Sequence, residues 1–392
     1  MKENFFETMT PEEKQRLAYI EGRPELFETK ILRLESSGET EQKNSLLVSS
    51  RDPGSGNALL PVIENLSHDP GLEIDIVTDG RAQEIFQKNL KTQDITPEEM
   101  FLKADKVIGR PKVILMDRSL EMGIDTYTAA TFPEVPKILL GDHYNNPTKF
   151  LSELIARNLP LPEKICVMDE AAKKLITKKF PELADRIEIT GQPAFDRFVQ
   201  EDTEKIAQLV KEKLGLQSTD KLVSFMSTRD EPEKIRQVAE AIRELANDFY
   251  LAFRRHPRDN VSYENYRQIF TDAGIRLLDT EKFSTNDIGA ASDLILTTWS
   301  TEGLHGIYRR KPTVHLVDRN FRIPDGLDLP LIPVKLGASV GIKKADQLKE
   351  ILPQLLDANS ELNNSLREKM EQNYPADGKN AERVANVVRQ YI

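Results

Sequence analysis

Short apolar runs recur along most of this chain, and amphipathic segments of helical period lie between them. The runs have the length of buried strands, and the segments between them carry apolar residues three or four positions apart. Such alternation predicts parallel sheets with helices on both faces. In chain order, the expected strands are Ser45–Ser49, Leu72–Thr78, Lys112–Met116, Lys137–Leu140, Lys164–Met168, Arg186–Thr190, Lys221–Met226, Phe249–Arg254, Ile275–Leu278, Asp293–Thr297, Thr313–Val317 and Leu331–Val334.

The amphipathic segment Asp202–Leu214 interrupts this alternation, which restarts after Gly215. A chain of 392 residues is too long for one compact core. We therefore predict an α/β protein with two Rossmann-like doubly wound domains that face a cleft. The predicted parts are a helical extension (1–44), an N-terminal Rossmann-like domain (45–200), a C-terminal Rossmann-like domain (201–379) and a C-terminal helix that crosses back to the first domain (380–392).

The helical extension contains Thr10-Pro-Glu-Glu13, which is the pattern of a capping box with proline at the first helical position. This extension could pack on the body of the protein or on another subunit, as in a homodimer. The net charge of −10 at pH 7 and the absence of long basic runs argue against nucleic acid as a partner.

The chain contains no apolar stretch of the length that a membrane span needs, about 20 residues. We therefore expect no transmembrane segment. The single cysteine, Cys166, lies in an apolar run and cannot form an intrachain disulfide, which fits a reducing compartment. Together these features predict a cytoplasmic protein.

The segment Asp293-Leu-Ile-Leu-Thr-Thr-Trp-Ser-Thr-Glu-Gly-Leu-His305 joins an apolar run to a predicted helix through a short polar turn. A helix N-terminus has unpaired backbone N–H groups and the positive end of the helix dipole, so it can bind a phosphate or diphosphate. We expect Ser300 or Thr301 to cap this helix and Glu302 to reach a sugar hydroxyl. His305 lies on the same helix as a further binding candidate. An ordinary capped turn is the alternative.

Gly54 and Gly56 follow the first strand and open a helix, so the backbone there could approach a ligand closely. The third glycine of a dinucleotide-binding fingerprint is missing, because Leu59 stands in its place. NAD is therefore disfavoured. A plain tight turn is the alternative interpretation of the glycine pair.

Asp117, Asp142 and His143 fall where strands end in the predicted cleft. Either aspartate could act as a general base toward an acceptor hydroxyl, and a histidine beside an aspartate can do the same work near neutral pH. For the carboxylates, a helix N-cap or turn is the alternative role.

Arg229, His256 and Arg258 follow strands of the second domain. Arg229 could pair with a phosphate through two parallel hydrogen bonds, and His256 or Arg258 could neutralise a leaving diphosphate. These residues together indicate a nucleotide-diphosphate site. The spacings of Cys, His and carboxylate residues form no metal site, and we expect no cofactor.

At these positions the chain resembles the GT-B superfamily, to which nucleotide-sugar glycosyltransferases, UDP-N-acetylglucosamine 2-epimerases and CDP-glycerol glycerophosphotransferases belong. The resemblance covers residues 45–392. It depends on Gly54–Gly56, Gly191-Gln-Pro-Ala-Phe-Asp196, Thr228-Arg229, Arg255-His256-Pro257, Asp293–Lys311 and Asp377-Gly-Lys-Asn-Ala-Glu-Arg383. It implies that the first domain binds the acceptor and that the second binds the nucleotide-sugar donor.

The favoured function is a metal-independent glycosyltransferase that moves a sugar from a nucleoside-diphosphate sugar to a sugar or lipid-linked acceptor, in surface glycan synthesis. The 2-epimerases resemble the chain at Asp117, Asp142, Arg229 and His256. Their paired glycines and adjacent glutamates are replaced here by Ser300-Thr301 and Leu304-His305. The alternatives are such an epimerase, a CDP-glycerol glycerophosphotransferase-like enzyme, or a binding protein without activity.

Overall fold

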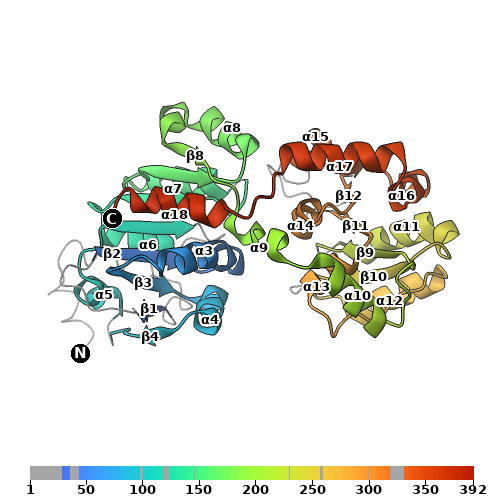
Figure 1. Ribbon diagram of the computed structural model, residues 1–392, viewed down its shortest axis with the longest axis horizontal. Coiled ribbons are helices and arrows are strands. Elements are labelled where there is room, and N and C mark those ends of the chain that lie inside the picture. Colours follow the sequence, from blue (N-terminus) through green and yellow to red (C-terminus); the bar gives the residue numbers. More distant parts are fainter. Residues whose placement is uncertain are drawn as a thin grey trace. The chain divides into compact units, whose positions relative to one another are not determined.

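The computed structural model describes residues 29–35, 44–97, 100–117, 123–144, 146–228, 230–256, 259–298, 300–317 and 331–392. The chain forms two compact units (Figure 1). Unit 1 comprises Met1–Asp196 and Gly378–Ile392, and unit 2 comprises Arg197–Asp377. Each unit has one sheet flanked by helices, which confirms the predicted α/β class with two Rossmann-like domains.

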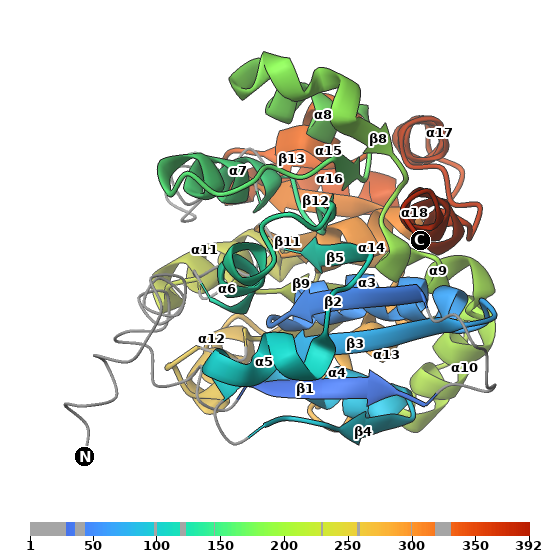
Figure 2. The same ribbon diagram turned by 90° about the vertical axis from the view of Figure 1, so that its left-hand side faces the viewer.

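Unit 1 contains an eight-stranded sheet in the order β4-β1-β3-β2-β5-β6-β7-β8. The strands from β3 to β8 in this order are parallel, and β1 runs antiparallel to both of its neighbours. Figure 2 shows β1, β3, β2 and β5 side by side. The strands are β1 (Lys30–Leu34), β2 (Asn44–Ser50), β3 (Leu72–Thr78), β4 (Thr92–Asp94), β5 (Val113–Asp117), β6 (Lys137–Leu140), β7 (Lys164–Val167) and β8 (Ile187–Ile189).

Within residues 1–44, which were predicted to form a helical extension, the described segment Lys30–Leu34 is instead the strand β1. It pairs with β3, and the Arg33 guanidinium binds the Asp75 carboxylate through two contacts of 2.8 Å. Only Ile31 and Leu32 of this strand are fully buried, and so short an apolar run carries no periodic signal. The capping box at Thr10 lies outside the described residues.

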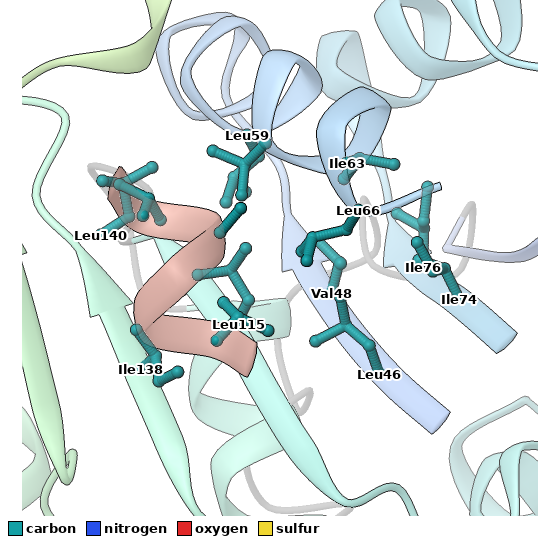
Figure 3. Packing of buried hydrophobic residues seen from close by; sticks show 14 of the residues in the cluster. Leu46, Val48, Leu59, Ile63, Leu66, Ile74, Ile76, Leu115, Ile138 and Leu140 are labelled. Carbon is teal, nitrogen blue, oxygen red and sulfur yellow. The ribbon is translucent and has the colours of Figure 1, made fainter. Parts of the chain in front are cut away.

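The helix α3 (Pro53–Leu66) covers the middle of the unit 1 sheet. Its residues Leu59, Ile63 and Leu66 point toward the side chains of β2, β3, β5 and β6 (Figure 3). Spacings of three and four residues place these side chains on one helix face. The other helices and turns of unit 1 are α4 (Gly80–Asn89), α5 (Met100–Ile108), α6 (Ile124–Thr131), α7 (Asn146–Ala156), α8 (Glu170–Lys179), η2 (Pro181–Arg186), η3 (Pro193–Phe195) and α18 (Asn380–Arg389).

Unit 2 contains a five-stranded parallel sheet in the order β10-β9-β11-β12-β13. Its strands are β9 (Leu222–Met226), β10 (Tyr250–Arg254), β11 (Leu294–Thr297), β12 (Thr313–Leu316) and β13 (Val340–Ile342). Its helices and turns are α9 (Arg197–Gln200), α10 (Thr203–Lys213), α11 (Pro232–Ile242), η4 (Arg243–Leu245), α12 (Tyr263–Asp272), α13 (Thr285–Ala291), α14 (Glu302–Tyr308), α15 (Leu331–Lys335), η5 (Ala345–Gln347), α16 (Leu348–Leu356) and α17 (Glu361–Asn373).

Two predicted strands of unit 2 differ from the structure. Residues Leu331–Val334 lie in the helix α15, because a short apolar run fits either a strand or one helical turn. Ile275–Leu278 forms no strand and contributes one isolated bridge between Leu277 and Leu251. The strands β4 of unit 1 and β13 of unit 2 were not predicted, because three residues each are too few to give an alternating pattern.

Candidate functional site

In both sheets, polar residues gather where the strand order reverses. In unit 1, β2 lies between β3 and β5, so the chain adds strands first on one side of β2 and then on the other. In unit 2, β9 is flanked in the same way by β10 and β11. The crevice at the carboxyl ends of such a strand pair is the usual ligand site of open α/β sheets. The carboxyl ends of these strands are therefore the candidate sites of the two units.

In unit 1, the structure brings Gly54 and Asp142 together. A Cβ atom at Gly54 would lie 2.8 Å from the Asp142 Oδ2, so the carboxylate lies against the first turn of α3. The positive end of the α3 dipole favours a negative charge at this place. Gly56 instead faces α4, where its Cβ would lie 3.2 Å from Ala82. Gly56 therefore allows two helices to pack, which is not the predicted approach to a ligand.

Asp117 is the last residue of β5 and is fully buried. It pairs in register with Leu140, which directly precedes Gly141 and Asp142. The predicted residues Asp117 and Asp142 therefore lie at the carboxyl ends of two neighbouring strands, β5 and β6. Asp117 has no access to solvent, so its role as a base toward an acceptor would require the site to open.

A buried polar network at the end of β2 was not predicted. The Ser49 hydroxyl donates to the Asp125 Oδ1 at 2.9 Å, and the Thr128 hydroxyl contacts the Ser49 Oγ at 3.3 Å. Asp125 and Thr128 belong to α6, and Ser49 belongs to β2. No local sequence pattern joins these residues, because they become neighbours only when α6 packs on the sheet.

His143 is half-buried and follows Asp142 in the loop after β6. Burial, and next the nearby positive charge of Lys149, lower the pKa of the imidazole to about 4. His143 is therefore neutral at pH 7 and has a ring nitrogen that can accept a proton. The next residue, Tyr144, donates from its hydroxyl to the Asp169 Oδ2 at 2.6 Å.

In unit 2, four polar residues form a cluster between the ends of β9 and β11. The Asp230 Oδ2 accepts from the Ser227 hydroxyl at 2.9 Å, the Thr228 backbone N–H at 3.1 Å and the Thr298 hydroxyl at 3.4 Å. The hydroxyls of Thr228 and Thr298 are also in contact with each other. Burial raises the pKa of Asp230, and these hydrogen bonds partly offset it. Asp230 and Thr298 were not predicted as site residues, although Asp230 follows Thr228-Arg229 and Thr298 lies inside the segment Asp293–His305.

Of the three cationic residues predicted for unit 2, the structure describes His256. Arg229 and Arg258 lie outside the described residues. His256 is half-buried at the end of β10, and its backbone carbonyl accepts from Asp259 N–H at 2.9 Å. Arg255 is exposed and donates to the Asp259 carbonyl at 2.9 Å.

The turn before α14 is arranged differently from the prediction. Thr301 occupies the N-cap position, and its side chain makes no capping hydrogen bond. The Ser300 Oγ accepts from Glu302 N–H at 3.3 Å, while Ser300 N–H donates to the Thr297 Oγ1 at 3.2 Å. Ser300 therefore supports the turn, and Thr301 remains exposed.

Glu302 points into a cationic cluster. Its Oε1 lies 3.0 Å from the His305 Nδ1, and its buried Oε2 has no hydrogen-bond partner among the described residues. Burial raises the pKa of Glu302, but His305, Arg309 and Arg197 outweigh burial and lower it overall. Glu302 is thus ionised, and one of its oxygens is still able to accept a hydrogen bond.

The Arg309 side chain organises this cluster and is fully buried. It was not predicted as a site residue. Its Nε and Nη2 donate to the two Glu201 oxygens at 3.1 and 3.2 Å, and Nη2 donates to the Asn286 Oδ1 at 2.6 Å. The guanidinium lies 4.3 Å from the centre of the Phe198 ring, which also contacts His305 at 5.1 Å. Glu201 and Arg309 are 108 positions apart, so no local pattern could have paired them.

The sequence model of the CDP-Glycerol:Poly(glycerophosphate) glycerophosphotransferase family matches residues 143–390. The chain belongs to this family. The match begins at His143 and includes all of unit 2 and all of α18. Membership in the glycerophosphotransferase family favours the alternative prediction, a CDP-glycerol glycerophosphotransferase-like enzyme, over the favoured sugar transferase. No curated protein sequence matches the chain.

Solved structures that resemble the chain confirm the GT-B fold. The UDP-GlcNAc 2-epimerase from Neisseria meningitidis bound to UDP-GlcNAc is 15% identical with a TM-score of 0.61, over 88% of this chain and 100% of that one. A putative UDP-N-acetylglucosamine 2-epimerase from Listeria monocytogenes is 17% identical with a TM-score of 0.63, over 89% and 96%. The wall teichoic acid polymerase TagF, as a variant, is 12% identical with a TM-score of 0.52, over 97% and 93%.

The described part of the chain has neither a membrane-spanning helix nor a metal-binding cluster. None of its helices is long and apolar enough to span a membrane. Among the same residues, His, Cys, Asp and Glu side chains form no group of three that could hold a metal ion.

Proposed function

We propose that this protein transfers glycerol phosphate from CDP-glycerol, or a closely related CDP-activated polyol, to a hydroxyl group of a polymer acceptor of the teichoic acid class. The family match over residues 143–390 supports this proposal most directly, because it includes both polar clusters of unit 2 and His143. A wall teichoic acid polymerase TagF structure obtained with CDPG has the same fold and supports the choice of donor.

The proposed reaction differs from sugar transfer in the bond that breaks. The acceptor oxygen forms a bond with the phosphorus atom that carries glycerol, and the bond between this phosphorus and the bridging oxygen breaks. CMP leaves with the bridging oxygen, and the acceptor proton passes to a base. A glycosyltransferase would instead break the bond between sugar and diphosphate and release a nucleoside diphosphate. The leaving nucleotide therefore distinguishes the two functions.

Unit 2 is proposed to bind the donor at the end of β9 and β11. The Ser300 hydroxyl can donate to a phosphate oxygen, and it lies beside the polar cluster of Thr228, Asp230 and Thr298, where the strand order reverses. His256, with the predicted contacts of Arg229 and Arg258, would stabilise the negative charge on CMP as it leaves. The Glu302 Oε2 is buried and has no hydrogen-bond partner among the described residues, so it would accept from a hydroxyl of the donor once the site opens.

Unit 1 is proposed to supply the base. His143 is neutral, so it can take the proton of the acceptor hydroxyl. The Asp142 carboxylate, beside Gly54, would orient the acceptor.

The nucleotide product tests this proposal. We would incubate the protein with CDP-glycerol or UDP-N-acetylglucosamine and a glycerophosphate oligomer, and separate the nucleotides by anion-exchange chromatography. We expect CMP from the first donor. Release of UDP from the second, without CMP from the first, would show that the protein is a sugar transferase.

His143→Gln tests the base. Loss of a general base should lower kcat by about a hundredfold or more. The exposed His68 provides the matched control, since His68→Gln removes an imidazole from unit 1 at a distance from the strand ends. We expect His68→Gln to retain wild-type turnover. Equal activity of both variants would exclude His143 as the base.

A further inference from the structure

The Gly191–Asp196 segment attaches the C-terminal helix α18 to unit 1. Gly191 has a φ of 83°, and a Cβ there would overlap with the Asn380 side chain. The Asp196 carboxylate accepts from the backbone N–H groups of Asn380 and Ala381 at 3.0 and 2.8 Å, and so caps α18. The Asn380 Nδ2 donates to the Gln192 carbonyl at 3.1 Å. The backbone of Gln192 is therefore held by the first residue of α18.

The side chain of Gln192 bonds to the loop that follows β6. Its Nε2 donates to the Asp142 backbone carbonyl at 2.6 Å, and its Oε1 accepts from Ala194 N–H at 3.3 Å. Gln192 is 3% exposed. A carbonyl can only accept, and a backbone N–H can only donate, so these two bonds fix the orientation of the amide.

The loop from Gly141 to Tyr144 has two further anchors. Gly141 N–H donates to the Cys166 carbonyl in β7 at 2.8 Å, and the Tyr144 hydroxyl donates to Asp169. The Gln192 bond lies between these anchors and is made to Asp142 itself. Removing this bond would take away one of the contacts that fix Asp142, while both ends of the loop stay attached.

We infer that Gln192 is a positioning residue, which holds Asp142 and His143 in the arrangement needed for catalysis, and that Asn380 holds Gln192 in place. The inference rests on the proposed function, because it takes His143 as the base. A buried carbonyl that loses its donor favours a conformation in which it reaches water. Movement of a reacting group by about 1 Å can lower a rate about a hundredfold.

Gln192→Ala and Gln192→Glu test the role of the amide donor. We expect both to lower kcat by about tenfold to a hundredfold. The glutamate retains the shape of Gln192, but an ionised carboxylate cannot donate to the Asp142 carbonyl. We expect KM for CDP-glycerol to change by less than about twofold, because the donor is assigned to unit 2. Asn380→Ala should give the same pattern with a smaller loss. Full activity of Gln192→Glu would overturn the inference.

Arg389→Gln is the matched control for general loosening of α18. Arg389 binds both Asp69 oxygens at 2.8 Å near the other end of the helix, away from the Gln192 contacts. We expect Arg389→Gln to lower Tm at least as much as Gln192→Ala and to leave kcat unchanged. If Arg389→Gln lost as much kcat as Gln192→Ala, loosening of the helix would explain both, and the inference would be wrong.

The titration of His143 gives a readout that does not depend on turnover. Its imidazole has a pKa of about 4, against an ordinary 6.5. NMR of histidine-labelled protein, with the His143 signal assigned through His143→Gln, should show this pKa moving toward 6.5 in Gln192→Ala as the loop opens. An unchanged titration would overturn the inference whether or not CMP is formed. A shifted titration in a protein that forms no CMP would support the positioning role and overturn the proposed function.

Discussion

Several buried polar side chains in this protein are held by backbone groups, and burial changes their ionisation. The Lys137 ammonium donates to the carbonyls of Phe132, Pro133 and Val135 at 2.9, 3.1 and 2.6 Å. Burial lowers the pKa of Lys137 to about 8, so the group is still largely protonated at pH 7. Lys137 lies at the start of β6, at the opposite end of the strand from Asp142. Its role is therefore structural.

His315 should make unit 2 less stable in weak acid. It is 2% exposed, its Nδ1 lies 3.0 Å from the Ser339 Oγ, and burial lowers its pKa to about 4 from an ordinary 6.5. The unfolded chain binds a proton below pH 6.5, whereas the folded unit does so only near pH 4. The stability that neutral His315 contributes is complete above pH 6.5 and decreases as the pH falls toward 4. Between pH 7 and 5 we expect a loss of about 2 kcal/mol.

Urea unfolding at pH 7 and pH 5 measures this loss. The difference between the two free energies of unfolding should be smaller in His315→Gln by the same amount, since the variant has no imidazole to protonate. His68→Gln, at an exposed site, should retain the wild-type pH dependence. Identical pH dependence in wild type and His315→Gln would contradict the prediction.

The helix α18 belongs to unit 1, although the sequence of unit 2 lies between it and the rest of that unit. It lies beside α3 (Figure 1). Its residues Val384, Ala385 and Val388 are buried in the same core as Leu59 and Leu66. This spacing puts the apolar residues on one helix face. Unit 1 therefore depends on the C-terminal segment to complete its core.

Val384→Ala should destabilise unit 1. The side chain is fully buried, and removing two methyl groups costs the lost burial and leaves a cavity, together about 2 kcal/mol. Glu382→Ala, at an exposed position of α18, should change the free energy of unfolding by less than about 0.5 kcal/mol. Hydrogen exchange of the β2 amides measures the free energy of unfolding of unit 1 in both variants. Equal effects would show that α18 adds little to the core.

The two units have separate sheets and cores, and the chain passes between them after Asp196 and again after Asp377. Each therefore has its own source of stability. A ligand that binds one unit alone should stabilise that unit, because it lowers the free energy of the folded form to which it binds.

CDP should protect unit 2 in hydrogen exchange. At a concentration of about 100 Kd, binding adds about 2.7 kcal/mol, which slows exchange through global unfolding about a hundredfold. We expect this in β9 and β11, and no such change in β2 and β5. Protection of β2 and β5 alone would place the nucleotide in unit 1 and contradict the proposed donor site.

The local pattern of the sequence was enough to predict most strands and the fold class. Strands buried on both faces are continuous apolar runs, as in Leu46–Val48 and Leu294–Leu296, and such runs are visible without any tertiary information. The positions of Asp117, Asp142 and His143 after strands followed from the same pattern, because parallel strands present their carboxyl ends at one edge. Short segments such as Lys30–Leu34 and Leu331–Lys335 were misassigned, since so few residues define no period.

The sequence pattern could not supply the contacts that hold the candidate site. Glu201 contacts Arg309, and Gly191 contacts Asn380, across more than a hundred residues in each case, and these residues become neighbours only in the folded units. The ionisation of His143 and Glu302 depends on burial and on neighbours from other elements. Periodicity and turn signals act over a few residues, whereas desolvation and charge pairing depend on distance in space. Most of the strands therefore follow from the sequence pattern, whereas the chemistry of the side chains at their ends is decided by packing.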